Sequence, residues 1–245
     1  AFNRAVVLSA LGQHAPCVEA CAGFLKLRPC DPEALLLQGV SYAALGRHEA
    51  ALAAFDQTYE HRADVHVRRA ASLLQLGRVE DGLTAAARAS GIDPRNADAH
   101  YHRGQAFGML EMWPEAVEAL DAALALAPGK VGIRALRSAA LANIGRFDEA
   151  LADIDAALAR APDRAELLAR RAYILGAAGR VDDALAAHER ALKVAPNHAP
   201  TLYAKCDLLL GSGDFERGLA LYEVRHKVHR PFAPPSPAPL WNGEA

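Results

Sequence analysis

The sequence predicts an all-α protein, an α-solenoid assembled from about seven helix-turn-helix units. The first observation is composition: the 245 residues include 55 Ala and 33 Leu, only 6% are aromatic, and β-branched residues are sparse. This mixture is typical of helices that pack closely through small side chains. The second is a period near 34 residues, and the third is a set of prolines that close most of the units. Together they argue against a β-sandwich, a β-barrel and a disordered chain.

Turn glycines mark the period most clearly. Their separations are 34, 31, 68, 34 and 34 residues, and Glu111 fills the missing place. The glycines are Gly12, Gly46, Gly77, Gly145, Gly179 and Gly213. Two series of small residues keep the same step, which is expected where two helices cross at close range. They are Cys17, Ala51, Gly82, Ala116, Ala150, Ala184 and Gly218, and Ala5, Gly39, Ala70, Gly104, Ser138, Ala172 and Cys206.

The period divides the chain into seven units in order. These are residues 1–31, 32–62, 63–96, 97–130, 131–164, 165–198 and 199–230, followed by a Pro-rich extension or linker at 231–245. Each unit contains a first helix, a glycine turn, and a second helix whose first turn is often acidic, as its dipole favours. Prolines 29, 94, 128, 162 and 196 end these helices. The second unit is three residues short and lacks this proline, so we expect a tighter or more twisted joint near His61 and Arg62.

This pattern resembles the tetratricopeptide repeat family across roughly residues 1–228. Aromatic positions of the family are occupied here by Phe55, Trp113, Phe147, Phe215 and Tyr222. The resemblance implies a right-handed superhelix whose inner face comes mainly from the first helix of each unit. It also implies a protein or peptide as the partner.

Outward positions of the first helices define a candidate peptide-binding groove. They are Phe2, Asn3, Leu36, Val40, Val67, Arg68, Tyr101, His102, Gln105, Asn143, Arg170, Tyr173, Tyr203 and Asp207. The three tyrosines are suited to anchor an extended peptide, while Arg68, His102 and Arg170 are suited to hold its carbonyls or acidic side chains. The alternative is that these are ordinary solvated polar residues.

A ladder of cations lies just before the first small residue of the units. Its members are Arg4, Arg69, Arg103, Arg137, Arg171 and Lys205. Such a stripe is suited to an acidic or phosphorylated partner. We favour the alternative, in which each stem covers a seam between units and each charge pairs with a neighbouring Asp or Glu.

No catalytic, cofactor-binding or metal-binding pattern is recognisable, so the sequence predicts no enzyme activity in this chain. Asp98 and His102 share a helix face, but no third ligand accompanies them. A net charge of −2 argues against nucleic-acid binding, and no apolar run is long enough for membrane insertion. Cys17 and Cys21 are expected to be reduced packing residues, which favours a cytoplasmic location.

The leading hypothesis is therefore a non-catalytic scaffold for protein–protein interaction. Residues 213–225 followed by 239–244 resemble the junction at which bacterial repeat arrays run into a glycosyltransferase domain. That resemblance implies an alternative function as the acceptor-recognition arm of a larger enzyme, and Leu240 and Trp241 would then cap the last unit. The first residue is not Met, so we expect a piece of a longer protein. Homo-oligomerisation through terminal faces is a third hypothesis.

Overall fold

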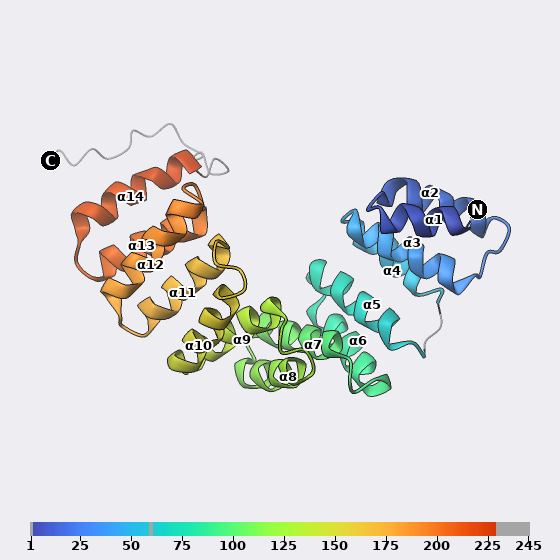
Figure 1. The fold of residues 1–245 in the computed structure, drawn as a ribbon, viewed down its shortest axis with the longest axis horizontal. Helices are drawn as coiled ribbons and strands as arrows, with labels where there is room; N and C mark the ends of the chain where they lie inside the picture. Colours follow the sequence, from blue (N-terminus) through green and yellow to red (C-terminus); the bar gives the residue numbers. More distant parts are fainter. Residues whose placement is uncertain (1, 59–60, 229–245) are drawn as a thin grey trace. The chain divides into compact units, whose positions relative to one another are not determined.

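The computed structural model describes residues 2–58 and 61–228, except for the side chains of 223–228. In these residues the chain forms fourteen α-helices and no strand (Figure 1). The helices are α1 (Phe2–Ala10), α2 (His14–Leu25), α3 (Pro32–Ala44), α4 (His48–Phe55), α5 (Ala63–Gln75), α6 (Val79–Ile92), α7 (Ala97–Met109), α8 (Trp113–Leu126), α9 (Val131–Asn143), α10 (Phe147–Leu158), α11 (Ala165–Ala177), α12 (Val181–Val194), α13 (Ala199–Gly211) and α14 (Phe215–Val228). The predicted all-α solenoid class is confirmed. The sense of its superhelix stays a prediction of the resemblance.

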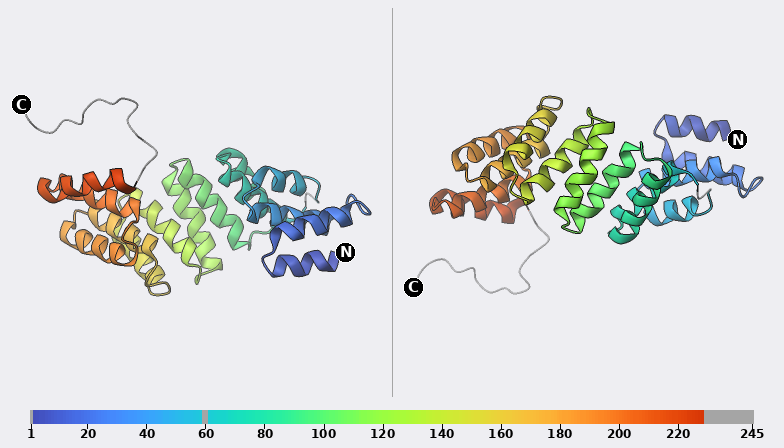
Figure 2. Two further views of the ribbon diagram at one scale, coloured as in Figure 1. Left: turned by 90° about the horizontal axis from the view of Figure 1, so that it is seen from above. Right: turned by 90° about the horizontal axis from the view of Figure 1, so that it is seen from below.

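The helices group into two compact units, Ala1–Ile144 and Gly145–Ala245, each made of several helix-turn-helix repeats. Below, "unit" means one of these two parts of the chain, and "repeat" means one helix-turn-helix element. The first unit contains α1 to α9 and the second α10 to α14, so the division falls at the turn of the fifth predicted repeat. Within each unit the helices follow one another side by side in chain order (Figure 2). The Pro-rich extension, including Leu240 and Trp241, lies outside the described residues.

The turn between the two helices of a repeat has a left-handed backbone at one position. All six turn glycines have φ between +70° and +87°, where an L side chain is strained. Glu111 occupies the same place with φ +59°. The prediction that it substitutes for a turn glycine is confirmed, and it does so at a conformational cost.

The two small-residue series lie at the crossings of the helices, and every member is buried. Their size is required sterically: a Cβ added to Gly104 would lie 2.5 Å from Leu120 Cγ. One added to Gly218 would lie 2.6 Å from Leu210 Cδ2. Larger residues at these positions would separate the two helices of a repeat.

First helices of successive repeats contact one another. In the first unit α1 contacts α3, α3 contacts α5, α5 contacts α7 and α7 contacts α9, and in the second unit α11 contacts α13. Second helices make no corresponding contacts in the described part of the chain. Because one layer is close and the other is spread apart, each unit curves with its first helices on the inner face.

The short second repeat is shortened in its second helix. Helix α4 has 8 residues, whereas α6 and α8 each have 14. At the joint that follows, the Arg62 guanidinium lies 2.9 Å from Asp64 and 2.5 Å from Glu33 of α3. These ion pairs tie the start of α5 to the preceding first helix.

Cys17 and Cys21 are buried and free, as predicted. Cys17 Sγ donates to the Ala5 carbonyl at 3.2 Å and accepts a hydrogen bond from Ser41 Oγ at 3.1 Å. Burial, with the Cys17 thiol beside it, raises the pKa of Cys21 to about 12. The Cys21 thiol therefore stays protonated, and both buried side chains act as packing groups.

Candidate functional site

The inner face of the first unit contains a pocket of about 200 Å³ where three successive first helices meet. Helices α3, α5 and α7 supply most of its wall, and α4 supplies the remainder. The lining residues are Val40, Ala43, His48, Phe55, Arg68, Ala71, Ser72, Gln75, His102 and Gln105. Four of them belong to the predicted groove: Val40, Arg68, His102 and Gln105. We call this the α3–α5–α7 pocket.

Apolar residues and unsatisfied polar groups coexist in this pocket. Phe55 is fully buried beneath it, with 1% of its surface exposed. Ser72 is equally buried, and its Oγ has no hydrogen-bond partner. His48 Nδ1 is also buried without a partner. Buried polar groups are normally paired, so these two atoms are exceptions within one pocket.

The polar rim of the pocket carries positive charge at Arg68, whose side chain is exposed. Opposite it, His102 Nδ1 lies 3.2 Å from Gln105 Oε1, which suits a ring N–H donating to the amide oxygen. Burial lowers the pKa of His102, although the Gln105 contact and nearby Asp98 raise it. His102 is therefore mainly neutral at pH 7.

The inner face of the second unit holds another pocket, of about 320 Å³. We call it the α11–α13 pocket, because those helices and α12 form it. Its lining residues are Ala172, Tyr173, Gly176, Ala177, His188, Ala204, Asp207 and Leu208. Tyr173 and Asp207 were predicted as groove residues. Tyr173 is 57% exposed, and Asp207 is exposed as well.

One groove prediction is wrong. Leu36 is only 9% exposed and packs in a buried cluster with Phe55 and Val65. Helix α5 lies over that side of α3, so the Leu36 side chain faces the seam between repeats and not the groove. Tyr101 is half-buried for a related reason, since it packs against a cluster containing Leu120 and Ile133.

Other groove candidates lie outside both pockets. Phe2 stacks on Phe24 with a centroid distance of 5.3 Å, and Asn3 is exposed. Asn143 donates to the Ala139 carbonyl at 2.8 Å. The remaining candidates are half-buried, and they are Val67, Arg170 and Tyr203. Burial lowers the pKa of Arg170, which Glu166 partly offsets.

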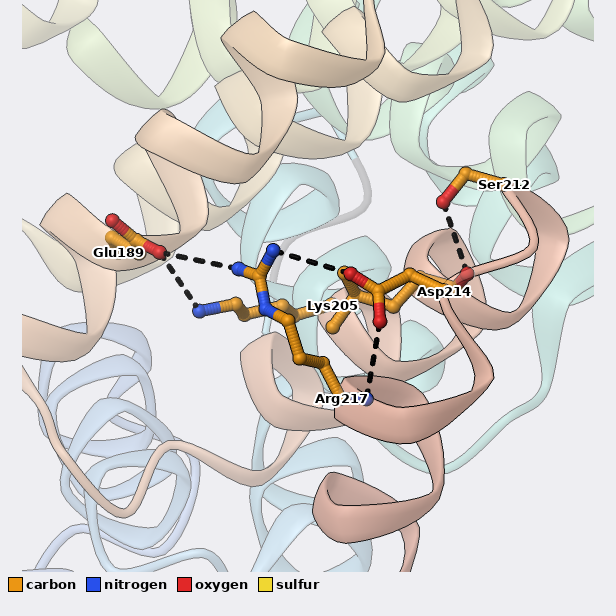
Figure 3. Close-up of polar contacts among 6 residues, drawn as sticks. Glu189, Lys205, Ser212, Asp214 and Arg217 are labelled. Carbon is orange, nitrogen blue, oxygen red and sulfur yellow. Dashed lines mark hydrogen bonds and ion pairs between the residues drawn. The ribbon is translucent and has the colours of Figure 1, made fainter.

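The cation ladder consists largely of ion pairs, as the favoured interpretation predicts. Arg69 pairs with Asp56, and three further cations pair with an acid of the preceding second helix. Figure 3 shows the last of these, where Glu189 Oε1 lies 3.2 Å from Lys205 Nζ and 3.9 Å from Arg217. Arg217 also contacts Asp214 at 3.2 Å. The structure thus assigns these charges to seams between helices.

Neither a metal site nor a membrane-spanning helix is found in the described ranges. No group of three or more His, Cys, Asp or Glu side chains is arranged to hold a metal there. Asp98, which shares a helix face with His102, pairs with Lys130 at 2.5 Å. None of the helices described has the length and hydropathy needed to cross a membrane.

Sequence reasoning missed the polar residues that come from the second helices and from buried first-helix positions. These are His48, Ser72 and His188. A signal existed for His188, because the same place in other repeats holds apolar residues such as Leu120 and Ile154. No comparable signal distinguished Ser72, since the equivalent residue of the preceding repeat is also a serine, Ser41.

Solved structures confirm the repeat fold. The chain is similar to a tetratricopeptide repeat protein from Parabacteroides merdae, with a TM-score of 0.74, 18% identity, and coverage of 93% of this chain and 91% of that one. It is similar to TTC0263, a thermophilic protein of the same kind in Thermus thermophilus, with a TM-score of 0.59, 25% identity, and coverage of 73% and 99%. YrrB, described as a repeat protein with an unusual peptide-binding site, has a TM-score of 0.55, 19% identity, and coverage of 69% and 88%.

No curated protein matches the sequence. The comparisons bear out the repeat part of the resemblance but do not show the glycosyltransferase junction, part of which lies outside the described residues. A family model for the tetratricopeptide repeat matches residues 3–64, 67–131 and 137–200, well over half of the chain. The chain therefore belongs to the tetratricopeptide repeat family, whose members are generally scaffolds for protein–protein interaction.

Proposed function

We propose that this chain is a non-catalytic scaffold that binds a peptide or protein segment on its inner, first-helix face. The observation that carries the proposal is the α3–α5–α7 pocket, where side chains of three repeats converge around an apolar floor. Two buried polar atoms there, Ser72 Oγ and His48 Nδ1, have no partner. A bound polypeptide supplies both apolar side chains and hydrogen-bonding backbone groups, which fits this mixture.

The pocket also favours one kind of segment. Val40, Ala43 and Ala71 leave room for an apolar side chain, and the Arg68 guanidinium at the rim attracts a neighbouring carboxylate. An aliphatic residue beside an acidic one is the sequence that matches this arrangement. The exposed position of Arg68 makes its effect dependent on salt.

The test starts from peptides selected on the full chain out of a randomised displayed library. Calorimetry then compares the wild type with Arg68→Ala and with Arg95→Ala, an exposed arginine in the loop between α6 and α7. We expect Arg68→Ala to weaken binding about 10-fold, or about 1.4 kcal/mol, and Arg95→Ala to leave it unchanged. Equal peptide affinities in the wild type and both variants would contradict the proposal that the peptide binds at the α3–α5–α7 pocket.

The alternative, that the chain is the acceptor-recognition arm of a bacterial glycosyltransferase, rests on the resemblance of residues 213–225 and 239–244 to such junctions. Sequencing the gene beyond Ala245 decides between the two. A glycosyltransferase-like domain in the continuing frame supports it, and a stop codon within a few residues eliminates it.

Homo-oligomerisation through terminal faces is a further proposal, supported by exposed apolar residues on two helices. Val7 of α1 is 57% exposed, and Phe215 of α14 is 63% exposed. Light scattering at high concentration tests this, and a mass that stays monomeric counts against it. The proposal of a cytoplasmic location is tested by fractionation of cells.

A further inference from the structure

His188 occupies a place that is apolar in the earlier repeats. Counting back along the repeats, the equivalent residues are Cys21, Phe55, Ala86, Leu120 and Ile154. Each is at most 1% exposed and packs at a crossing of two helices. His188 is buried to the same degree, with 1% of its surface exposed. Among the first six repeats, only the sixth therefore has an imidazole in place of a hydrophobic core side chain.

The imidazole is not satisfied within the described part of the chain. His188 Nδ1 is buried and has no hydrogen-bond partner. Burial, with Lys205 nearby, lowers the pKa of the ring to about 4, so it is neutral at pH 7. A buried polar atom without a partner costs stability that an apolar residue here would not cost. Packing alone does not account for this residue.

The buried ring faces a pocket and not a closed core. His188 lines the α11–α13 pocket, whose other walls are short or aliphatic: Ala172, Gly176, Ala177, Ala204 and Leu208. A hydrogen-bonding group from a ligand that enters the pocket therefore has a short path to the ring. Leu120 and Ile154, at the equivalent place, have 0% exposure, and neither carries a hydrogen-bonding group.

The charge of the pocket selects the ligand. Asp207 is the one charged residue of its lining, and no hydrogen bond or ion pair of its carboxylate is found among the side chains described. Tyr173, which also lines the pocket, has 57% of its surface exposed, so an aromatic face is available. A carboxylate, an aromatic ring and a neutral imidazole all favour a cation that donates hydrogen bonds.

We propose that the α11–α13 pocket binds the basic side chain, lysine or arginine, of the polypeptide that the inner face holds. The aliphatic stem lies along Ala172, Gly176 and Leu208. The charged end pairs with Asp207 at the rim, and one of its N–H groups donates to the neutral His188 ring. This inference rests on the proposed function, because it assigns a second anchor for the same class of partner, in the other compact unit.

The experiment uses the full chain and capped amino acids as probes. N-acetyl-lysine methylamide and N-acetyl-arginine methylamide are titrated while the ring resonances of His188 are followed by NMR. N-acetyl-norleucine methylamide, which has a similar stem without the charge, is the matched control. The His188→Leu variant, which restores the residue found at position 120, assigns the resonance by its disappearance. Asp163→Asn, which neutralises an exposed carboxylate in the loop between α10 and α11, serves as the matched control variant.

We expect saturable shifts of the His188 resonances with at least one basic probe, none with norleucine, and at least a tenfold weaker affinity in Asp207→Asn. Asp163→Asn is expected to bind the basic probes like the wild type. Equal shifts from norleucine, no shift from either basic probe, or unchanged affinity in Asp207→Asn would each overturn the inference. Because these probes require no selected peptide, a failure here leaves the Arg68 test of the proposed function intact, and the reverse also holds.

Discussion

The Arg171 guanidinium lies 2.7 Å from the Asp155 carboxylate, 16 residues earlier in the chain. The same interval of 16 residues joins Arg137 to Asp121 and Lys205 to Glu189. Arg69 of the third repeat pairs with Asp56 of the second repeat, which is three residues short, so these two residues are correspondingly closer in sequence. In these four first helices a cation thus reaches back to an acid at or near the preceding second helix.

Arg103 lacks this acid, since the equivalent residue is Ala87. Its Nε is buried without a partner, and its guanidinium lies 5.9 Å from the ring centroid of Phe107. We expect Ala87→Asp to complete the pair and to raise the free energy of unfolding by about 0.5–1 kcal/mol, measured by urea denaturation. The same substitution in an Arg103→Ala background should bring no gain, and an equal gain there would refute the pairing.

Glu111 carries backbone strain that a glycine would relieve. Its φ of +59° is unfavourable for an L side chain, whereas Gly77 holds the equivalent turn at +72°. We expect Glu111→Gly to stabilise the protein by about 0.5 kcal/mol, because relief of strain exceeds the added entropy of the unfolded chain. Gly77→Ala is the mirror experiment and should destabilise by about 1 kcal/mol. Thermal unfolding of both variants checks the pair, and a loss of stability in Glu111→Gly would contradict it.

His188 makes stability depend on pH in a defined window. Its pKa falls from 6.5 to about 4 on folding, so the unfolded chain takes up this proton first as the pH decreases. The free energy of unfolding is therefore unaffected by this proton above pH 6.5. It decreases as the pH falls towards 4, by at most about 1.4 kcal/mol per pH unit. Urea denaturation at several pH values should show a shallower dependence in His188→Leu. The pKa of His102 is lowered too. Because His102 is present in both the wild type and His188→Leu, its effect on the pH dependence cancels in the comparison.

Two predicted anchor tyrosines should behave differently on substitution. Tyr101 is half-buried, packs near Leu120 and Ile133, and contacts the His102 ring at 5.1 Å between centroids. Tyr101→Ala should therefore lower the free energy of unfolding by about 1–3 kcal/mol. Tyr173 is 57% exposed, so Tyr173→Ala should change it by less than about 0.5 kcal/mol. Equal losses of unfolding free energy in the two variants, measured by denaturation, would show that the exposure of these tyrosines does not determine their contribution to stability.

Much of the fold followed from features that act within one repeat. A turn glycine specifies its own backbone conformation, and Gly104 has to be small because Leu120, on the next helix along the chain, lies against it. Such constraints recur at each period and are visible in sequence. Leu36 shows the limit of this approach, because its burial depends on Val65 in the following repeat. The periodicity of the sequence shows which residues share a helix face only to within about one residue. Whether that face is covered depends on the helix of the neighbouring repeat.

The sequence by itself determined the helical class, the seven-fold repetition, the place of Glu111 in a glycine turn and the small residues at the crossings. Only the tertiary structure decided which side chains share a pocket. Val40, Arg68 and His102 come from three repeats, and their convergence depends on how successive hairpins stack. The structure also decided that His188 is buried without a partner. The physical reason is that local residues control each hairpin, whereas the angle between hairpins results from packing many side chains together.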